Sequence, residues 1–478
     1  MNRSRLLRNR LVSLSGMAGL MAAVAGGPVA ADTFVMTTGN TALGRGAGVA
    51  SSTFAGVPGT AGVQFLAAGS GGVVIVMANG TLKAWGYNMF GELMADTAVP
   101  TTVPGYTQVR QVVCGSYFAV VLLANGTVCA SGLKVHGPQL VQGPLTPIPE
   151  LTNVTAVACG SDHTLALLAD GTVKAFGYNY YGQLGTGTTA DHDRPVTIPG
   201  LAGVTAIGCG AWHSFARLAD GSLVTWGWNT FHELGREGDN TTPLPCGLAG
   251  ATSFDGGNFH SVSALADGTV KGWGYNGPVG SQLWLLGFDT PDFPWDQTTP
   301  RLIPGLGGVV EIRCGDNCTL ARRQDNTVLG FGWNGLGQLG MGHTADVPVP
   351  AQVPGLGDVR QMACGSEFSA VLVERPGAFS GAVDMGQGWR WLPWFGFFAP
   401  MGDFGWIWHQ QHGFLCVQVE STPQSIWLYA PDMGWLWTSS DLYPFLFRHA
   451  DGVWIWYNGA VNPRWFRNMA TGEWEARN

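Results

Sequence analysis

Charged residues are scarce in this chain of 478 residues. Asp, Glu, Lys and Arg together make up 12% of it, whereas an ordinary soluble domain contains roughly 25%. Positive charge is the scarcer sign, with 24 Lys and Arg against 32 Asp and Glu and a net charge of −8. Because nucleic acids and anionic membranes need Lys and Arg to neutralise phosphate, the composition argues against both as partners.

Several longer patterns are also missing. The chain has no heptad repeat and no three-residue Gly period, which excludes a coiled coil and a collagen-like chain. It has no apolar run long enough for a transmembrane helix. It also lacks a zinc-protease helix motif, a Ser elbow and a phosphate-binding loop, so we expect neither an enzyme nor a bound metal or cofactor.

The N-terminus reads as an export signal. Its basic residues are Arg3, Arg5, Arg8 and Arg10. An apolar stretch, Leu11–Ala25, follows them, and small residues precede Asp32. This order predicts a signal peptide over 1–31. A core helix or a membrane anchor fits less well, because the apolar stretch is short and rich in Gly. We therefore expect an exported protein, in the periplasm, at the cell surface or outside the cell.

A repeat of about fifty residues fills the middle of the chain. One Gly marks each copy: Gly69, Gly115, Gly160, Gly210, Gly257, Gly315 and Gly365. In the clearest copy an Asp170-Gly171 turn separates two apolar runs, an aromatic corner follows at Phe176–Asn179, and Gly-Gln-Leu-Gly ends it at Gly182–Gly185. Asp-Gly between apolar runs is a strong hairpin signal. Several short strands in each of seven copies predict an all-β, seven-bladed β-propeller.

The seventh copy is incomplete, and its missing half stands at the other end of the chain. Val359–Val373 supplies only the first two strands. Thr33–Asn40 matches Thr172–Asn179 in register. We therefore predict that the mature N-terminus completes the last blade and closes the propeller over 32–375. Closure would hide the two sheet edges that an open ring exposes.

These motifs resemble the regulator of chromosome condensation repeat family, whose members form seven-bladed propellers. The family includes a nuclear exchange factor for a small GTPase, a plant ultraviolet photoreceptor and secreted bacterial proteins that bind enzymes. An exported, acidic chain is a poor match for the exchange factor. The photoreceptor relies on clustered Trp two residues after the repeat Gly, and only Trp212 stands at that position here. The resemblance thus implies a secreted binding propeller rather than a guanine-nucleotide exchange factor or a hydrolase.

Two sets of side chains could suggest metal binding or disulfides. His163, His213 and His260 each stand three residues after the repeat Gly. Equivalent positions on different blades do not converge, so we expect packed histidines that bond to the neighbouring strand. Five of the nine Cys precede the repeat Gly: Cys114, Cys159, Cys209, Cys314 and Cys364. We interpret them as small buried residues, although an exported protein also permits disulfides.

Aromatic residues at the corners of the repeat are the candidate binding residues. They are Tyr87, Tyr178, Trp228, Tyr275 and Trp333, with Phe90, Tyr180, Tyr181 and Phe231 close by in the sequence. If the corners share one face of the propeller, these rings form an exposed rim of the kind that anchors protein interfaces. Alternatively, they pack between adjacent blades. The sequence leaves both placements open.

The C-terminal part differs in composition. We expect a linker over 376–388 and a module over 389–478, which holds 12 of the 20 Trp. Turn glycines at Gly413, Gly434, Gly452 and Gly472 predict a meander of hairpins. The pattern is loosely similar to aromatic hairpin repeats that bind choline or glucans. The Trp could stack on sugars and tether the protein to the cell envelope, or they could build the core of a module with few aliphatic residues, which we favour.

We therefore expect an exported, monomeric, non-catalytic binding or scaffold protein. Its leading function is recognition of a protein partner through one propeller face. The alternative is carbohydrate or cell-envelope binding led by the Trp-rich module.

Overall fold

A computed structural model of the protein describes residues 32–40, 44, 50–86, 97–132, 141–277, 285–288, 296–375, 383–386, 389–392, 394–400, 406–418, 421, 425–458 and 463–477. All regular elements within these ranges are β-strands, which confirms the all-β prediction. The signal peptide predicted over 1–31 lies outside the described residues.

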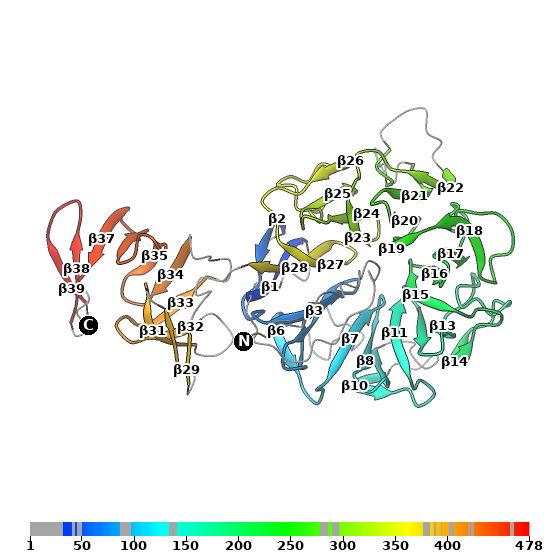
Figure 1. Ribbon diagram of the computed structural model, residues 1–478, viewed down its shortest axis with the longest axis horizontal. Coiled ribbons are helices and arrows are strands. Elements are labelled where there is room, and N and C mark those ends of the chain that lie inside the picture. The colour runs from blue at the N-terminus through cyan, green and yellow to red at the C-terminus, as the bar shows by residue number, and fades with distance from the viewer. Residues whose placement is uncertain are drawn as a thin grey trace, which may run out of the picture.

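Seven antiparallel sheets of four strands each form the propeller (Figure 1). Three of them are β3 (Val63–Ala68), β4 (Gly72–Met77), β5 (Leu82–Gly86) and β6 (Thr97–Val103); β7 (Val109–Cys114), β8 (Phe118–Leu123), β9 (Val128–Gly132) and β10 (Val141–Pro147); and β11 (Val154–Cys159), β12 (His163–Leu168), β13 (Val173–Gly177) and β14 (His192–Thr197).

Three further blades follow in sequence order. They are β15 (Val204–Cys209), β16 (His213–Leu218), β17 (Ser222–Gly227) and β18 (Leu244–Ala249); β19 (Ala251–Gly256), β20 (His260–Leu265), β21 (Val270–Tyr275) and β22 (Asp296–Leu302); and β23 (Val309–Cys314), β24 (Cys318–Arg323), β25 (Val328–Gly332) and β26 (Val347–Gln352). The second strand of each blade is buried along nearly its whole length, because neighbouring blades cover both of its faces.

The hairpin turns form where the sequence predicts them, and a side chain fixes each one. The carboxylate of Asp170 accepts hydrogen bonds from the backbone N–H and the hydroxyl of Thr172, at 2.9 and 2.6 Å. Asp220 and Ser222 repeat the arrangement in the next blade. Such Asx turns stabilise the chain reversal between the second and the third strand of a blade.

The seventh blade joins the two ends of the propeller. It combines β27 (Val359–Cys364) and β28 (Phe368–Arg375) with β1 (Asp32–Gly39) and β2 (Ser51–Gly56), in the order β2-β1-β28-β27. β1 pairs with β28 without interruption, from Asp32 opposite Arg375 to Gly39 opposite Phe368. The predicted closure by the N-terminal strand is therefore confirmed, and it leaves no unpaired edge on β28.

Three histidines link four successive blades. Nε2 of His163 lies 2.9 Å from Oγ of Ser214, and Nε2 of His213 lies 2.9 Å from Oγ of Ser261. Nε2 of His260 bonds to Oγ1 of Thr319 in the same way, at 3.1 Å. The prediction that these histidines pack and bond to a neighbouring strand is confirmed.

The repeat Gly makes room for these rings. A Cβ on Gly160 would stand 2.2 Å from Cε1 of His163, so only Gly fits. Cys159, just before it, places its Sγ 3.6 Å from the hydroxyl of Thr164. All nine Cys are free thiols, and burial raises the pKa of Cys159, Cys209 and Cys314. The cysteines thus behave as small core residues rather than as disulfide partners.

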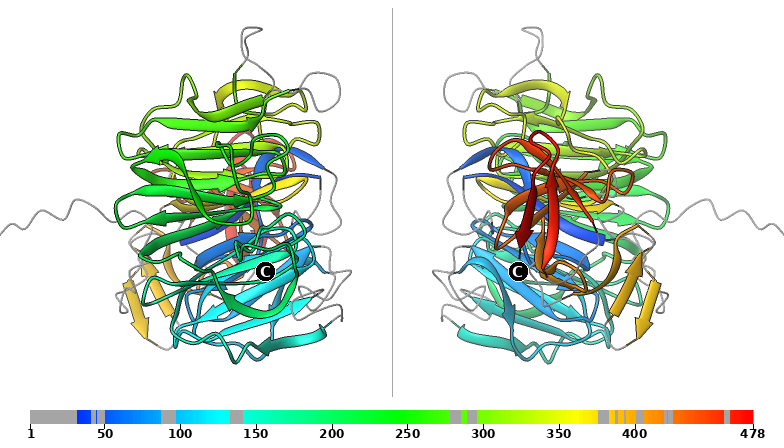
Figure 2. Two further views of the ribbon diagram at one scale, coloured as in Figure 1. Left: turned by 90° about the vertical axis from the view of Figure 1, so that its right-hand side faces the viewer. Right: turned by 90° about the vertical axis from the view of Figure 1, so that its left-hand side faces the viewer.

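The C-terminal residues form one antiparallel sheet of eleven strands in sequence order. The strands are β29 (Val383–Gly386), β30 (Trp389–Leu392), β31 (Gly396–Pro400), β32 (Trp406–His409), β33 (Gly413–Val417), β34 (Ile426–Ala430), β35 (Gly434–Thr438), β36 (Phe445–Arg448), β37 (Val453–Tyr457), β38 (Arg464–Asn468) and β39 (Trp474–Arg477). Its first strand lies inside the stretch that we expected to be a linker, over 376–388. Figure 1 shows this sheet, coloured from yellow-orange to red, beside the propeller, and in the right-hand view of Figure 2 its red strands lie in front of the propeller.

The core of this sheet differs from our expectation. The four predicted hairpins are present, as β32–β33, β34–β35, β36–β37 and β38–β39. However, the buried cluster consists of residues such as Leu415, Leu436, Ile455 and Phe466, and no described Trp of the sheet is among its fully buried members. The expectation that Trp builds this core is therefore wrong. A buried Trp needs a hydrogen-bond partner for its N–H, whereas Leu and Ile need none.

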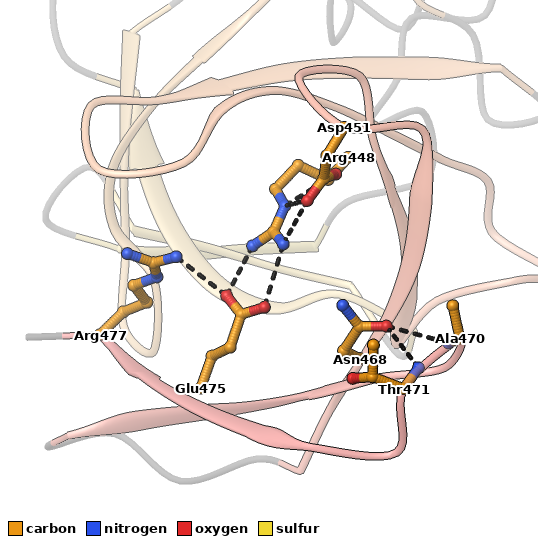
Figure 3. A network of polar contacts seen from close by, with 7 residues as sticks. All are labelled: Arg448, Asp451, Asn468, Ala470, Thr471, Glu475 and Arg477. Atoms are coloured by element: carbon orange, nitrogen blue, oxygen red, sulfur yellow. Dashed lines mark hydrogen bonds and ion pairs between the residues drawn. The ribbon is translucent and has the colours of Figure 1, made fainter.

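A polar network holds the last hairpins together (Figure 3). The guanidinium of Arg448 donates to Glu475 at 2.7 and 3.0 Å and to Asp451 at 2.6 to 3.1 Å. Arg477 adds a second guanidinium to Glu475, at 2.9 Å. The Arg448 side chain is only 9% exposed. These paired charges join β36 to β39 across the sheet.

Candidate functional site

One face of the propeller brings together two kinds of loop. The residue two positions after the repeat Gly accepts a backbone hydrogen bond from the corner aromatic of its own blade. The N–H of Trp228 donates to the carbonyl of Trp212 at 2.9 Å, and the N–H of Tyr275 donates to the carbonyl of Phe259 at 2.8 Å. Tyr178 and Asp162 are joined in the same way. The corners therefore share one face with the loops between the first and second strands.

Eight rings on this face form a contiguous cluster, which we call the aromatic surface. Its members are Tyr178, Tyr180, Tyr181, Trp212, Trp228, Phe231, Phe259 and Tyr275. They come from three successive blades, those that begin with β11, β15 and β19. The sequence left open whether these rings lie on a rim or between blades; the contacts show that they do both.

The rings support each other across the blade boundaries. The ring of Tyr181 lies 4.0 Å from that of Trp228, edge to face, and Trp212 lies 6.4 Å from Phe259. These contacts fix the rings, because edge-to-face pairs are favourable beyond the area that they bury. At the same time the rings reach the surface: Tyr180 is 65% exposed, and the others are half-buried. The surface is thus both ordered and accessible.

The structure accounts for most of the predicted site residues. It brings Tyr178, Tyr181, Trp228, Phe231 and Tyr275 into the aromatic surface. Trp333 stands at the equivalent corner of a later blade, where its N–H donates to the carbonyl of Asn317, and its ring is half-buried. Tyr87 and Phe90 lie outside the described residues.

Sequence reasoning left two members of the aromatic surface, Trp212 and Phe259, out of the candidate binding residues. Both stand two residues after the repeat Gly. The hairpin register could have revealed them, because β16 and β17 pair His213 with Gly227 and so place Trp212 beside Trp228.

The phenols of Tyr178 and Tyr275 stay neutral. Burial raises the pKa of Tyr178, and nearby Tyr181 and Asp191 raise it further. Burial and Asp296 raise the pKa of Tyr275 in the same way. These two residues therefore present apolar ring faces and neutral hydroxyl groups, which suit a protein surface better than a phosphate.

The central channel offers a second space, of about 310 Å³. The inner strands of all seven blades line it, and its charged residues include Asp255 and Arg313. Burial raises the pKa of Asp255 to about 6, although Arg313 opposes the shift. Both carboxylate oxygens accept backbone N–H groups, from Gly256 and Cys314 at 3.0 Å each. This carboxylate therefore fixes the backbone of two adjacent blades.

Metal ligands do not gather in the part of the chain that the structure describes: it contains no group of three or more His, Cys, Asp or Glu side chains that could hold an ion. Within the same ranges, no helix is both long and apolar enough to cross a membrane.

Seven four-stranded blades, closed by the N-terminal strand, define a seven-bladed β-propeller with one aromatic face. The sequence model of the RCC1-like domain matches residues 32–371. The chain belongs to this family, as its repeats indicated.

Individual relatives are more distant. Human protein RCC2 is 39% identical over 93 residues, and the Xenopus laevis homologue of RCC2 is 38% identical over 93 residues. Each match covers 18% of this chain and 18% of the relative, so the chain spans less than a fifth of their length.

Solved structures share the propeller. Prp20p from Saccharomyces cerevisiae, described with its binding properties to Gsp1p and histones, superposes with a TM-score of 0.64 and 21% identity over 72% of this chain and 92% of its own. Human WBSCR16 superposes with a TM-score of 0.62 and 23% identity, over 72% of this chain and 99% of its own. At these identities the likeness establishes the fold.

Proposed function

We propose that this protein is an exported, non-catalytic binding protein that recognises a protein partner through the aromatic surface. The observation that carries the proposal is the contiguous set of ordered, accessible rings on one propeller face. Tyr and Trp are enriched where interfaces concentrate their binding energy. Related propellers support the proposal, since Prp20p binds Gsp1p and histones and a further structure holds Kap60 on yeast RCC1.

The export part of the proposal rests on the N-terminal sequence. Four arginines precede the apolar stretch Leu11–Ala25, and β1 begins at Asp32, where we expect the mature chain to start. A cleaved chain would then enter the propeller at once, with Thr33 opposite Glu374. A small cytosolic GTPase would not meet an exported protein, so we expect an extracytoplasmic partner.

Affinity capture from the source organism tests the recognition step. The full-length protein, tagged at its C-terminus, is compared with Tyr180→Ala, which removes the most exposed ring of the aromatic surface. Leu302→Ala is the matched control, because Leu302 is also exposed but lies on the outer strand β22. We expect Tyr180→Ala to weaken recovery of a specific partner at least tenfold.

The two variants also define the contrary result. If Tyr180→Ala and Leu302→Ala lose the same amount of recovered partner at unchanged thermal stability, the partner does not bind through the aromatic surface. Recovery of a small GTPase as the partner would favour nucleotide exchange over the scaffold role.

A further inference from the structure

A second set of exposed rings runs along the C-terminal sheet. Each of the last four hairpins carries one large side chain at the same place, directly after its turn or at the start of its second strand. These residues are Phe414, Trp435, Trp454 and Trp474, which we call the aromatic stripe. They are between 36% and 48% exposed. Repetition at one structural position indicates a shared role.

The core does not need these rings. Strand residues alternate between the two faces of a sheet, and the residues next to the stripe, Leu415, Leu436 and Ile455, belong to the buried cluster. The sequence thus places aliphatic residues inside and Trp outside. Leaving large aromatic rings in water forgoes the free energy of burying them, so their exposure calls for a ligand.

Three of the four rings pack against an aromatic ring on the preceding strand, and the fourth, Trp474, packs against Trp456 two strands away, with ring centroids 5.9 Å apart. Trp408 pairs with Phe414 across the first hairpin, with ring centroids 4.7 Å apart. Tyr429 and Trp435 are 5.4 Å apart, and the rings of Phe447 and Trp454 are 5.5 Å apart. All three pairs are edge to face. A ring fixed in this way loses little further entropy when a ligand stacks on it.

The register spaces the stripe regularly. Cys416, Tyr429 and Trp435 stand in one row across the sheet, and Trp437, Phe447 and Trp454 stand in the next. Each hairpin is therefore displaced by two residues from the one before. With about 4.8 Å between strands and about 3.4 Å per residue, successive rings lie about 12 Å apart. A regular, linear series of rings fits a linear polymer with a similar repeat.

The charged side chains of the sheet indicate whether the ligand is neutral or anionic. Arg448 belongs to the row of Leu436, on the opposite face from the stripe, and it is bound to Asp451 and Glu475. Arg464 is likewise bound to Asp432. These two guanidinium groups are therefore not offered to a ligand on the stripe. Arg467 does lie on the stripe's face, opposite Trp474, and is exposed. One guanidinium is fewer than the cluster of cations that an anionic membrane requires, so the stripe suits a neutral ligand better than a polyanion or such a membrane.

Area argues against a second protein molecule here. Besides the four rings of the stripe, Trp408, Phe445 and Trp465 lie on the same face and are 38% to 40% exposed. A Trp buries at most about 250 Å², so seven rings that are about 40% exposed offer at most roughly 700 Å². A stable protein interface needs about 800 Å² on each side. We propose that the aromatic stripe binds a neutral, extended polysaccharide of β-linked pyranose units, whose sugar rings stack on Phe414, Trp435, Trp454 and Trp474.

The test measures binding of the full-length protein to microcrystalline cellulose and to soluble hydroxyethylcellulose, with the α-linked polymer dextran as the control. We expect binding to both β-linked polymers and at least tenfold weaker binding to dextran. The double variant Trp435→Ala/Trp454→Ala is expected to weaken binding at least tenfold. Trp435→Tyr/Trp454→Tyr keeps the rings and should retain most of it, which separates the loss of stacking from misfolding.

The propeller supplies the matched control. Tyr180→Ala removes an exposed ring outside the C-terminal sheet and should leave polysaccharide binding unchanged. The proposal would be overturned if the protein bound neither β-linked polymer. It would also be overturned if Trp435→Ala/Trp454→Ala left the binding unchanged. Stripe-dependent association with phosphatidylglycerol vesicles, or stripe-dependent dimerisation in sedimentation, would overturn it in favour of a membrane or a second copy.

Discussion

The histidines between blades predict a specific loss of stability in acid. The hydroxyl of Ser214 donates to the carbonyl of Gln183 at 2.9 Å, so it must accept its other hydrogen bond from Nε2 of His163. In the neutral imidazole the proton therefore sits on Nε2. Its Nδ1 is buried and has no hydrogen-bond partner among the described residues. Protonation would place a charge and an unsatisfied N–H at that atom.

Burial accordingly lowers the pKa of His163 to about 3. An unfolded His titrates near 6.5, so the unfolded state gains the proton first as the pH falls. The stabilising contribution is complete above pH 6.5 and is lost as the pH falls from 6.5 toward 3. Between pH 7 and pH 4.5 this amounts to about 2.5 kcal/mol for one His. His213 behaves in the same way, because burial lowers its pKa to about 3.

Phe is the matched substitution, because the chain already uses it at the same position. Phe118 and Phe368 stand three residues after the repeat Gly, and a Cβ on Gly115 would lie 2.2 Å from the Phe118 ring, just as for Gly160 and His163. At pH 7, His163→Phe should cost about 1 kcal/mol for the lost hydrogen bond. At pH 4.5 it should be the more stable protein by about 1.5 kcal/mol, since it removes the titration.

Urea unfolding at both pH values, followed by Trp fluorescence, measures this reversal. Glu233 and Asp255, whose pKa values burial raises to about 7 and about 6, shift stability in the opposite direction with pH. Both carboxylates are present in wild type and in His163→Phe, so their contributions cancel in the difference between the two free energies of unfolding. His343→Gln, at an exposed position, is the control for the removal of a His side chain. If His163→Phe loses as much free energy between pH 7 and pH 4.5 as wild type, the buried neutral imidazole is refuted.

Three further predictions concern closure, the C-terminal network and export. Val35→Ala, in the buried N-terminal strand, should lower the free energy of unfolding, measured by urea titration, by about 2 kcal/mol. The control Val349→Ala, at an exposed site, should change it by less than about 0.5 kcal/mol. Equal effects of the two variants would contradict closure by the N-terminal strand. Arg448→Met should lower the melting temperature by several degrees, because it leaves Glu475 and Asp451 without their main partner; an unchanged melting temperature would contradict the network. N-terminal sequencing of protein recovered outside the cytoplasm should begin at Asp32, whereas recovery with Met1 would refute the signal peptide.

Periodicity made the propeller and its closure predictable. Thr33–Asn40 could be matched to Thr172–Asn179 because each blade uses the same turn and corner residues, and pairing of β1 with β28 follows from that register. The Asp-Gly-Thr turns could be predicted because each one is completed locally, by hydrogen bonds between the Asp side chain and the Thr two residues later.

The surfaces were harder to predict, because they depend on which of two alternating sets faces inward. In Trp435-Leu436-Trp437 the alternation is plain, but it does not tell which set is buried. We expected the larger rings inside, and the structure buries Leu436 instead. Likewise the aromatic surface depends on contacts between blades, such as Tyr181 with Trp228, that no repeat within one blade specifies.

Site-specific photo-crosslinking tests the central claim most directly. A photoreactive amino acid is placed at position 180, in the aromatic surface, or at position 302, on the outer strand β22, both of which are exposed. The protein is then irradiated in its own organism. We predict a discrete crosslinked species containing one extracytoplasmic protein from position 180 and none from position 302. Crosslinking of that protein from position 302 but not from position 180 would contradict recognition through the aromatic surface.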